Sequence, residues 1–396
     1  MECTVRSSAV FKTAKNRDIR VIQTRAEVLK EENLMNGKNP FATTGGIIFV
    51  GAVIGLAAIL LQKLGNPANM GICVACFERD IAGGLGLHRA GIVQYIRPEI
   101  IGLVLGSLGA ALMSGEFRPR GGSSPLVRFV LGMIAAMGAL VFLGCPWRAV
   151  LRLAGGDFNA ILGIAGLVAG VGVGTMFFKR GYSLGSSVKQ SAAAGWLFPL
   201  IMVGLLVMLF AFPQVQGEGK SGLLFYSVKG PGSMHAPVLA SLGIAMLIGF
   251  LAQRSRFCTM GAIRDLILFR YAHLFLGLLA MLVAAFVANY FTGSFNLGFE
   301  KQPVAHTDGL WNFLGMMTAG LAFALAGGCP GRQLFMSGEG DSDAATFALG
   351  MIAGAAMAHN FGTASSGAGI GAYGIHATLI GFAVCLFIGF TNSKKA

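Results

Sequence analysis

The segment Gly144-Cys145-Pro146-Trp147-Arg148 recurs later in the chain as Gly328-Cys329-Pro330-Gly331-Arg332. The sequence numbers of the two cysteines differ by 184 (329 − 145 = 184), and those of the two arginines differ by the same amount (332 − 148 = 184). A Gly-Cys-Pro-x-Arg motif that returns at a fixed distance, with its fourth position changed from Trp to Gly, indicates an internal duplication.

A second motif repeats at nearly the same distance. Cys73, followed by Arg79-Asp80, returns as Cys258, followed by Arg264-Asp265, and the sequence numbers differ by 185 (258 − 73 = 185). Two motifs that share nearly one offset predict a chain built from two copies of one unit. The thiols and charges kept in both copies are therefore the first candidates for a functional site.

Composition defines the class of protein. The 396 residues are 55% hydrophobic and 12% charged, and the mean hydropathy is +0.70, which excludes an ordinary soluble globule. We predict an all-α, polytopic integral membrane protein with ten spans. The apolar runs start near residues 45, 95, 127, 158 and 195 in the first half and near 237, 268, 311, 343 and 374 in the second.

The net charge of +13 does not indicate a nucleic-acid partner, because the basic residues lie between apolar runs and form no basic domain. The positive-inside rule explains the charge better and predicts cytoplasmic N- and C-termini. The outer loops near residues 213–235 and 291–310 are less basic. The basic residues expected on the cytoplasmic side are Arg118, Arg120, Lys179, Arg180, Lys189, Lys394 and Lys395.

The composition also divides the chain. Residues 1–42 form a polar tail without the apolar core of a secretory signal. Because Lys30-Glu31-Glu32 could be encoded by a purine-rich, ribosome-binding-like stretch, Met35 is an alternative start. We expect a first transmembrane repeat at 43–213, an outer linker at 214–235 and a second transmembrane repeat at 236–392.

Five spans per half is an odd number, so the second repeat should enter the membrane from the opposite side. The two repeats would then be related by a pseudo-twofold axis in the membrane plane. Pro146 and Pro330 lack an amide donor and stand beside glycines, which makes each motif a poor continuous transmembrane helix. We therefore predict four re-entrant or broken-helix segments that meet near the centre of the membrane.

The motifs bring charges to membrane depth, where an arginine needs a partner or water. Two interpretations are compatible: internal ion pairs that hold the broken helices, and a positive field that attracts an anion to each mouth. The arginines are Arg79, Arg148, Arg152, Arg264 and Arg332, and the nearest carboxylates in sequence are Glu78, Asp80, Asp157, Asp265, Glu339 and Asp341.

A cysteine in an apolar helix is usually a small buried hydrophobe, and this interpretation suits Cys385 and the tail residue Cys3. It is weaker for the four repeated cysteines, which keep their places while their neighbours change. Thiols are weak hydrogen-bonding groups with a soft sulfur, and they suit a ligand that carries sulfur or selenium. The candidate pathway residues are Cys73, Cys145, Cys258 and Cys329.

Cys73 and Cys76 form a CxxC pair, but the position that matches Cys76 in the second repeat is Gly261. The pair is therefore a weak signal for redox or metal chemistry. A disulfide or a thiol relay between the two cysteines stays open. No histidine has ligand spacing to these thiols, so we expect neither zinc nor another cofactor.

With these motifs the chain resembles the YeeE/YedE family of sulfur-transport membrane proteins, and within it the YedE-like selenium transporters. The resemblance covers about residues 45–392 and rests on Cys73 to Asp80, the two Gly-Cys-Pro-x-Arg motifs, and Arg256 to Asp265. It implies an inverted-repeat fold in a bacterial inner membrane that takes up thiosulfate or related compounds. It also implies that Cys145, Cys329 and Cys258, with Cys73 as the matching fourth, pass the substrate through a central constriction.

The leading hypothesis is therefore a permease, not an enzyme, for a small sulfur- or selenium-containing anion. Arg79, Asp80, Arg148, Arg264, Asp265 and Arg332 would support its pathway. The alternative is an intramembrane enzyme for thiol redox or sulfur transfer. A third hypothesis is a membrane subunit that docks a soluble sulfur- or selenium-handling protein.

Overall fold

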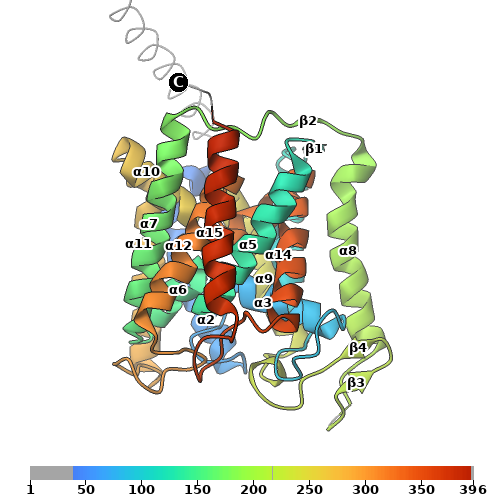
Figure 1. The fold of residues 1–396 in the computed structure, drawn as a ribbon. Helices are drawn as coiled ribbons and strands as arrows, with labels where there is room; N and C mark the ends of the chain where they lie inside the picture. The colour runs from blue at the N-terminus through green and yellow to red at the C-terminus, as the bar shows by residue number, and fades with distance from the viewer. Residues whose placement is uncertain (1–38, 216, 394–396) are drawn as a thin grey trace, which may run out of the picture.

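The computed structural model describes residues 39–215 and 217–393, so the alternative start at Met35 and most of the polar tail lie outside the described residues. The described chain is α-helical, with two sheets of two short strands each (Figure 1). The elements are η1 (Pro40–Ala42), α2 (Thr44–Lys63), α3 (Val74–Gly84), α4 (Pro98–Met113), β1 (Arg120–Gly121), α5 (Pro125–Phe142), α6 (Pro146–Ala154), α7 (Asn159–Lys179), β2 (Val188–Lys189), α8 (Ala192–Ala211), β3 (Lys220–Ser221), β4 (Leu224–Phe225), η2 (Pro231–Ser233), α9 (Val238–Ser255), α10 (Thr259–Phe269), α11 (His273–Phe291), α12 (Gly309–Ala326), α13 (Pro330–Gly338), α14 (Ser342–Asn360) and α15 (Gly374–Thr391).

The helices repeat as the sequence motifs do. The bounds of α10 follow those of α3 at the offset of 185 residues that separates Cys73 from Cys258, and the bounds of α12 and α13 follow those of α5 and α6 at the offset of 184 residues between the two Gly-Cys-Pro-x-Arg motifs. Each described half therefore contains five long helices and two short ones. The short helices are α3, α6, α10 and α13, and each begins directly after one of the four repeated cysteines.

The prediction of an all-α polytopic membrane protein is confirmed. Eight segments of the described chain are long and apolar enough to cross a membrane, and three of them join a long helix to the short helix that follows. The two long helices that do not qualify are α4, which is apolar but has 16 residues, and α14, which has Asp343 in its first turn.

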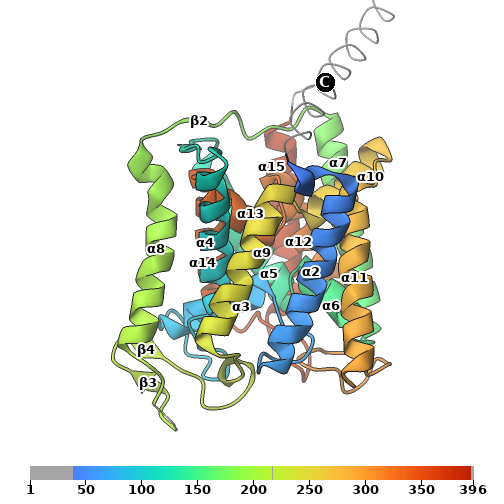
Figure 2. The ribbon, with the colours of Figure 1, turned by 180° about the vertical axis from the view of Figure 1, so that it is seen from behind.

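The two halves run in opposite directions. In Figure 2, α2 starts at the face where the chain ends, whereas its counterpart α9 ends at that face. The same view shows α11 descending from that face and α4 rising toward it. This is the inverted arrangement that five spans per half predict. The loop that contains β3 and β4 lies at the opposite face (Figure 1).

The two repeats interleave instead of forming separate bodies. The tightest helix pairs join one half to the other: α2 with α11, α4 with α9, α5 with α14, and α7 with α12. Glycines make these contacts close. A Cβ atom at Gly166 would overlap the carbonyl oxygen of Phe313, and one at the matching Gly350 would overlap that of Phe129. Because both partners keep the offset of the repeat, the packing itself obeys the pseudo-twofold symmetry.

We expect Gly170→Ala to destabilise the protein and Gly172→Ala to be neutral or stabilising. A Cβ at Gly170 would overlap the carbonyl oxygen of Met317 in α12, whereas nothing lies within 4 Å of a Cβ at Gly172. Overpacking a close contact costs roughly 1–3 kcal/mol. Thermal unfolding of the purified variants in detergent measures the difference, and equal melting temperatures would show that this contact does not limit stability.

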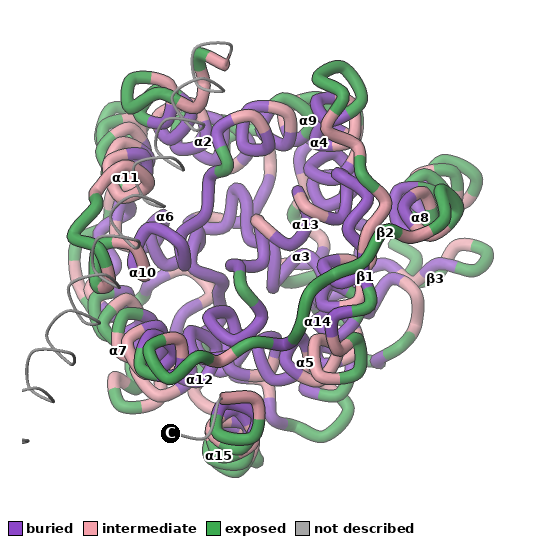
Figure 3. Tube along the Cα trace, turned by 90° about the horizontal axis from the view of Figure 1, so that it is seen from above, coloured by how far each residue is buried: buried purple, intermediate pink, exposed green. Residues whose placement is uncertain are grey.

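Figure 3 shows that the long helices surround α3, α6 and α13, with α8 and α15 at the outer edge. All residues of α3 are buried. In α10 the first five residues are buried, and the helix becomes more exposed toward its end. The centre of the molecule is therefore made of the short helices and the cysteines that precede them.

Candidate functional site

The four repeated cysteines have one structural role in common, because each is the N-cap residue of a short helix. All four have extended backbone angles, as N-cap residues typically do. The Sγ atom of Cys73 accepts a hydrogen bond from the amide of Cys76 at 3.4 Å, and Sγ of Cys258 accepts one from the amide of Gly261 at 3.3 Å. These two thiols thus take the capping position that a serine or aspartate oxygen usually occupies, whereas the side chains of Cys145 and Cys329 form no capping hydrogen bond.

The structure brings the thiols together in pairs, one pair per repeat. The backbone amide of Cys145 donates to Sγ of Cys73 at 3.5 Å, and the thiol of Cys258 donates to Sγ of Cys329 at 3.8 Å. All four are free thiols and buried, and Cys258 is the most accessible of them at 8%.

Trp147 connects the two pairs. Its indole ring lies 5.8 Å from the ring of Phe257, which precedes Cys258, and 6.0 Å from the ring of Phe335 in α13. A Cβ atom at Gly331 would lie 3.2 Å from Cζ2 of Trp147. Gly331 is the repeat counterpart of Trp147, and two counterparts can touch only near the symmetry axis. Trp147 therefore marks the pseudo-twofold axis, at the centre of the molecule.

The electrostatic setting suits an anion. The first turns of α3, α6, α10 and α13 contain no acidic residue. Helix N-termini carry a partial positive charge and unpaired amides, which favour negative ligands. The neighbouring thiols add polarisable sulfur without adding a countercharge.

The Arg-Asp motif is paired in both repeats, but its burial differs. Arg79 and Asp80 form a 2.7 Å ion pair, and Arg97 binds the other carboxylate oxygen of Asp80 at 2.7 Å. All three side chains are at most 2% exposed. Arg264 and Asp265 form a 2.8 Å pair whose side chains are 35% and 15% exposed. These charges hold the short helices and do not contact the thiols directly.

The prediction of arginine–carboxylate pairs is confirmed for Arg79 and Arg264, and also for Arg152 with Asp157 at 2.6 Å and Arg332 with Glu339 at 3.3 Å. Glu78, also expected as a partner, forms no ion pair within the described residues, and its buried Oε2 atom has no hydrogen-bond partner there.

The prediction is wrong for Arg148, which has no carboxylate partner among the described residues. Its guanidinium donates to the carbonyl oxygens of Leu143 and Val304, the latter at 3.0 Å, and lies 3.6 Å from Sγ of Cys76. Backbone carbonyls can satisfy the N–H donors of a buried guanidinium when several converge on it. Those of segment 303–304 come from the other half of the chain.

A network of ion pairs surrounds the approach to Cys258. Arg256 binds Glu116 at 2.9 Å and Glu339 at 2.7 Å, and Arg120 binds Glu339 at 3.2 Å. Burial alone would raise the pKa of the loop residue Glu116, but a hydrogen bond from Gln253 and the nearby arginines lower it below its usual value. This side of the centre is wetter than the Arg148 side, since Arg256 is 47% exposed and Arg148 is buried.

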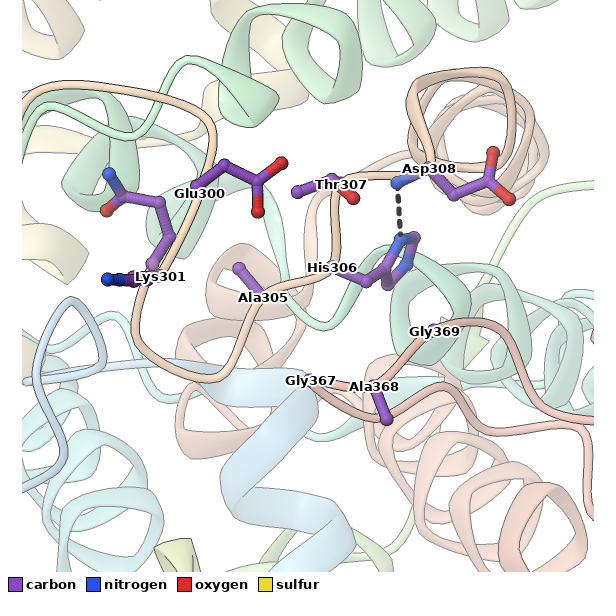
Figure 4. Close-up of a pocket in the computed structure, with 10 residues that line it drawn as sticks. Glu300, Lys301, Ala305, His306, Thr307, Asp308, Gly367, Ala368 and Gly369 are labelled. Carbon is purple, nitrogen blue, oxygen red and sulfur yellow. Dashed lines mark hydrogen bonds between the residues drawn. The ribbon is translucent and has the colours of Figure 1, made fainter.

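A pocket of about 510 Å³ lies in the loops that precede α12 and α15, and it is lined by residues 300–302, 305–308 and 367–369 (Figure 4). Its lining contains no cysteine. In this pocket the amide of Asp308 donates to Nδ1 of His306 at 3.3 Å. The adjoining carbonyls of residues 303 and 304 bind Arg148. The loop that lines this pocket therefore also binds Arg148 of the first repeat.

Within the described residues, no group of three or more His, Cys, Asp or Glu side chains could hold a metal ion. Each thiol pair offers two soft ligands, which is fewer than a structural zinc site uses.

Sequence reasoning missed the central role of Trp147 and the second partner of Asp80, Arg97. The contact between Arg148 and the thiol of Cys76 was not predicted either. The sequence did contain a signal for the role of Trp147, because this residue is replaced by Gly331 in an otherwise repeated motif. Nothing in the sequence indicates the other two contacts, because Arg97 and Arg148 approach from other segments of the fold.

The fold and the site define a polytopic helical membrane protein whose two inverted halves bring cysteine-capped short helices to a common centre. Residues 254–385 match the sulphur transport family. The matched segment includes both cysteines of the second repeat, Cys258 and Cys329. No curated protein matches the chain.

Proposed function

We propose that this protein is a membrane permease that takes up a small anion containing sulfur or selenium, such as thiosulfate, through its cysteine-lined centre. The observation that carries the proposal is that the four repeated cysteines are the N-cap residues of short helices and form two buried pairs, between which Trp147 packs. The match of residues 254–385 to the sulphur transport family supports a sulfur compound as the substrate class. Weak thiol contacts suit transport, because a site that holds an ion too tightly cannot release it.

The orientation of the protein in the membrane is also part of this proposal. We propose a bacterial inner membrane with both chain ends on the cytoplasmic side. Arg120 and Lys189, which pair across β1 and β2, lie at the face where the chain ends, as the positive-inside rule requires (Figure 1). The pocket in Figure 4 would then face outward and the ion-pair network around Arg256 inward.

Competition uptake into liposomes tests the function. The purified chain would be offered labelled thiosulfate with an excess of unlabelled selenite, selenosulfate or sulfate. We expect uptake of thiosulfate that selenosulfate inhibits and sulfate does not, because sulfate lacks a soft terminal atom. Uptake by the chain alone would also exclude an obligatory soluble partner. Failure of every sulfur and selenium anion to enter would refute the permease.

The 3.8 Å distance between the thiols of Cys258 and Cys329 favours a second candidate, an intramembrane thiol redox or sulfur-transfer enzyme. Mass spectrometry after exposure to substrate separates the two functions. A persulfide, selenosulfide or turnover-dependent disulfide on these cysteines would support the enzyme. Transport by a Cys329→Ser variant would support hydrogen bonding.

A further inference from the structure

Two buried hydrogen-bond donors at the centre have no partner among residues 39–215 and 217–393. The indole Nε1 of Trp147 and the hydroxyl of Thr259 belong to side chains that are each 1% exposed, and neither atom has a hydrogen-bond partner in the part of the chain that the structure describes. Buried polar atoms are almost always paired in folded proteins. Other buried polar atoms of the described residues also lack a partner, so the position of these two donors beside the thiols is what makes them candidates for binding a ligand.

Both donors lie beside the same thiol pair. Thr259 is the first residue of α10 and follows Cys258 directly. In Trp147, the ring edge formed by Cζ2 and Cε2 faces Gly331, at 3.2 and 3.4 Å from a Cβ placed there. Nε1 is bonded to Cε2, so it lies at the first turn of α13, which Cys329 caps.

The repeat shows that these donors are specific to one side. The residue that matches Thr259 in the first repeat is Val74, which has no hydroxyl, and the one that matches Trp147 in the second is Gly331. The Cys73 and Cys145 pair thus has no equivalent of either donor. The two neutral donors, Trp147 and Thr259, therefore distinguish the pair of Cys258 and Cys329 from the pair of Cys73 and Cys145.

We propose that Trp147 and Thr259 bind the oxygen atoms of a sulfur oxyanion whose terminal sulfur or selenium contacts Cys258 and Cys329. This inference rests on the proposed permease function and defines its substrate class: an anion with a soft terminal atom at one end and oxygens at the other. N–H and O–H donors suit oxygen, whereas thiols suit sulfur. Neutral donors also recognise the anion without the strong attraction of a buried arginine, which would slow its release.

Two conservative replacements test this inference in liposomes. Thr259→Val removes the hydroxyl at nearly constant shape, and Trp147→3-benzothienylalanine replaces the indole N–H by sulfur. A lost hydrogen bond to a charged group weakens binding by roughly 10- to 150-fold, so each variant should raise the KM for thiosulfate at least tenfold. Inhibition by thiocyanate, which has a soft sulfur but no oxygen, should change less than twofold.

Matched controls come from the same chain. Thr175→Val removes a hydroxyl that bonds within its own helix, to the carbonyl of Gly172 at 2.7 Å. The benzothienyl replacement at Trp196 alters a ring that packs on Phe117 in the periphery. Both controls should keep the wild-type KM.

The outcomes distinguish a failure of the oxygen-binding role from a failure of the permease function. Wild-type thiosulfate uptake with an unchanged KM in both test variants overturns the oxygen-binding role alone. Equal weakening of thiosulfate and thiocyanate would also overturn it, because a general distortion of the centre would affect both anions. No thiosulfate uptake by the wild type would refute the permease for this anion, and the inference with it.

Discussion

Replacing Cys329 by alanine should reduce uptake of the transported anion by roughly two orders of magnitude while the protein still folds and inserts. Its thiol lies 3.8 Å from that of Cys258 at the start of α13, and the side chain is 1% exposed. A dehydrated anion at this position is stabilised by few groups, and the variant removes one of them, the thiol of Cys329. Cys145→Ala should have the same effect from the other thiol pair. Initial uptake rates in proteoliposomes, normalised to the amount of inserted protein, measure both.

Cys385→Ala is the matched control. Cys385 is also a fully buried cysteine, but it lies in the peripheral helix α15, away from the short helices. It should retain wild-type uptake. If Cys145→Ala and Cys329→Ala both transport normally, the thiols do not form the pathway and the proposed permease mechanism is wrong.

Asp80→Asn should cause a large loss of stability, about 3–5 kcal/mol, because it leaves two buried arginines without their shared carboxylate. Arg79 and Arg97 each bind a different oxygen of Asp80 at 2.7 Å, and all three side chains are nearly inaccessible. The side-chain amide of asparagine could accept a hydrogen bond from only one of the two arginines, and it would not balance their positive charges. The midpoint of thermal unfolding in detergent and the yield of folded protein are the measurements.

The internal repeat supplies the control. Asp265→Asn changes the counterpart position, where the single partner Arg264 is 35% exposed. Exposed ion pairs contribute about 0–1 kcal/mol, so this variant should unfold close to the wild-type temperature. Similar losses in the two variants would show that burial does not distinguish the two copies of the motif.

The sequence was sufficient for the plan of the fold. Hydropathy predicted the helices, the odd number of spans predicted the inversion, and proline close to glycine predicted broken segments at Cys145 and Cys329. These features depend on local residue chemistry and on a repeat that can be read directly. The structure adds that all four repeated cysteines are helix N-caps, which explains why each one stands just before a helical run.

The contacts that cross between repeats could not be predicted. Arg148 binds the carbonyl of Val304, which lies far along the chain in the second half, and a carbonyl leaves no signature in the sequence. The meeting of Trp147 and Gly331 likewise depends on where the symmetry axis passes. Motif spacing cannot give that position, because it says how far apart two copies lie along the chain and not which of their side chains touch.

The interleaving of the two repeats also affects how the protein is made. The packing faces of α5 and α7 are completed by α14 and α12, which leave the ribosome much later. The long helices of the first half must therefore remain in the lipid with their glycine-lined faces uncovered until the second half has been synthesised. Assembly is a late event that involves the whole chain, and a nascent chain halted before α12 would present unfinished surfaces to the membrane's quality-control proteases.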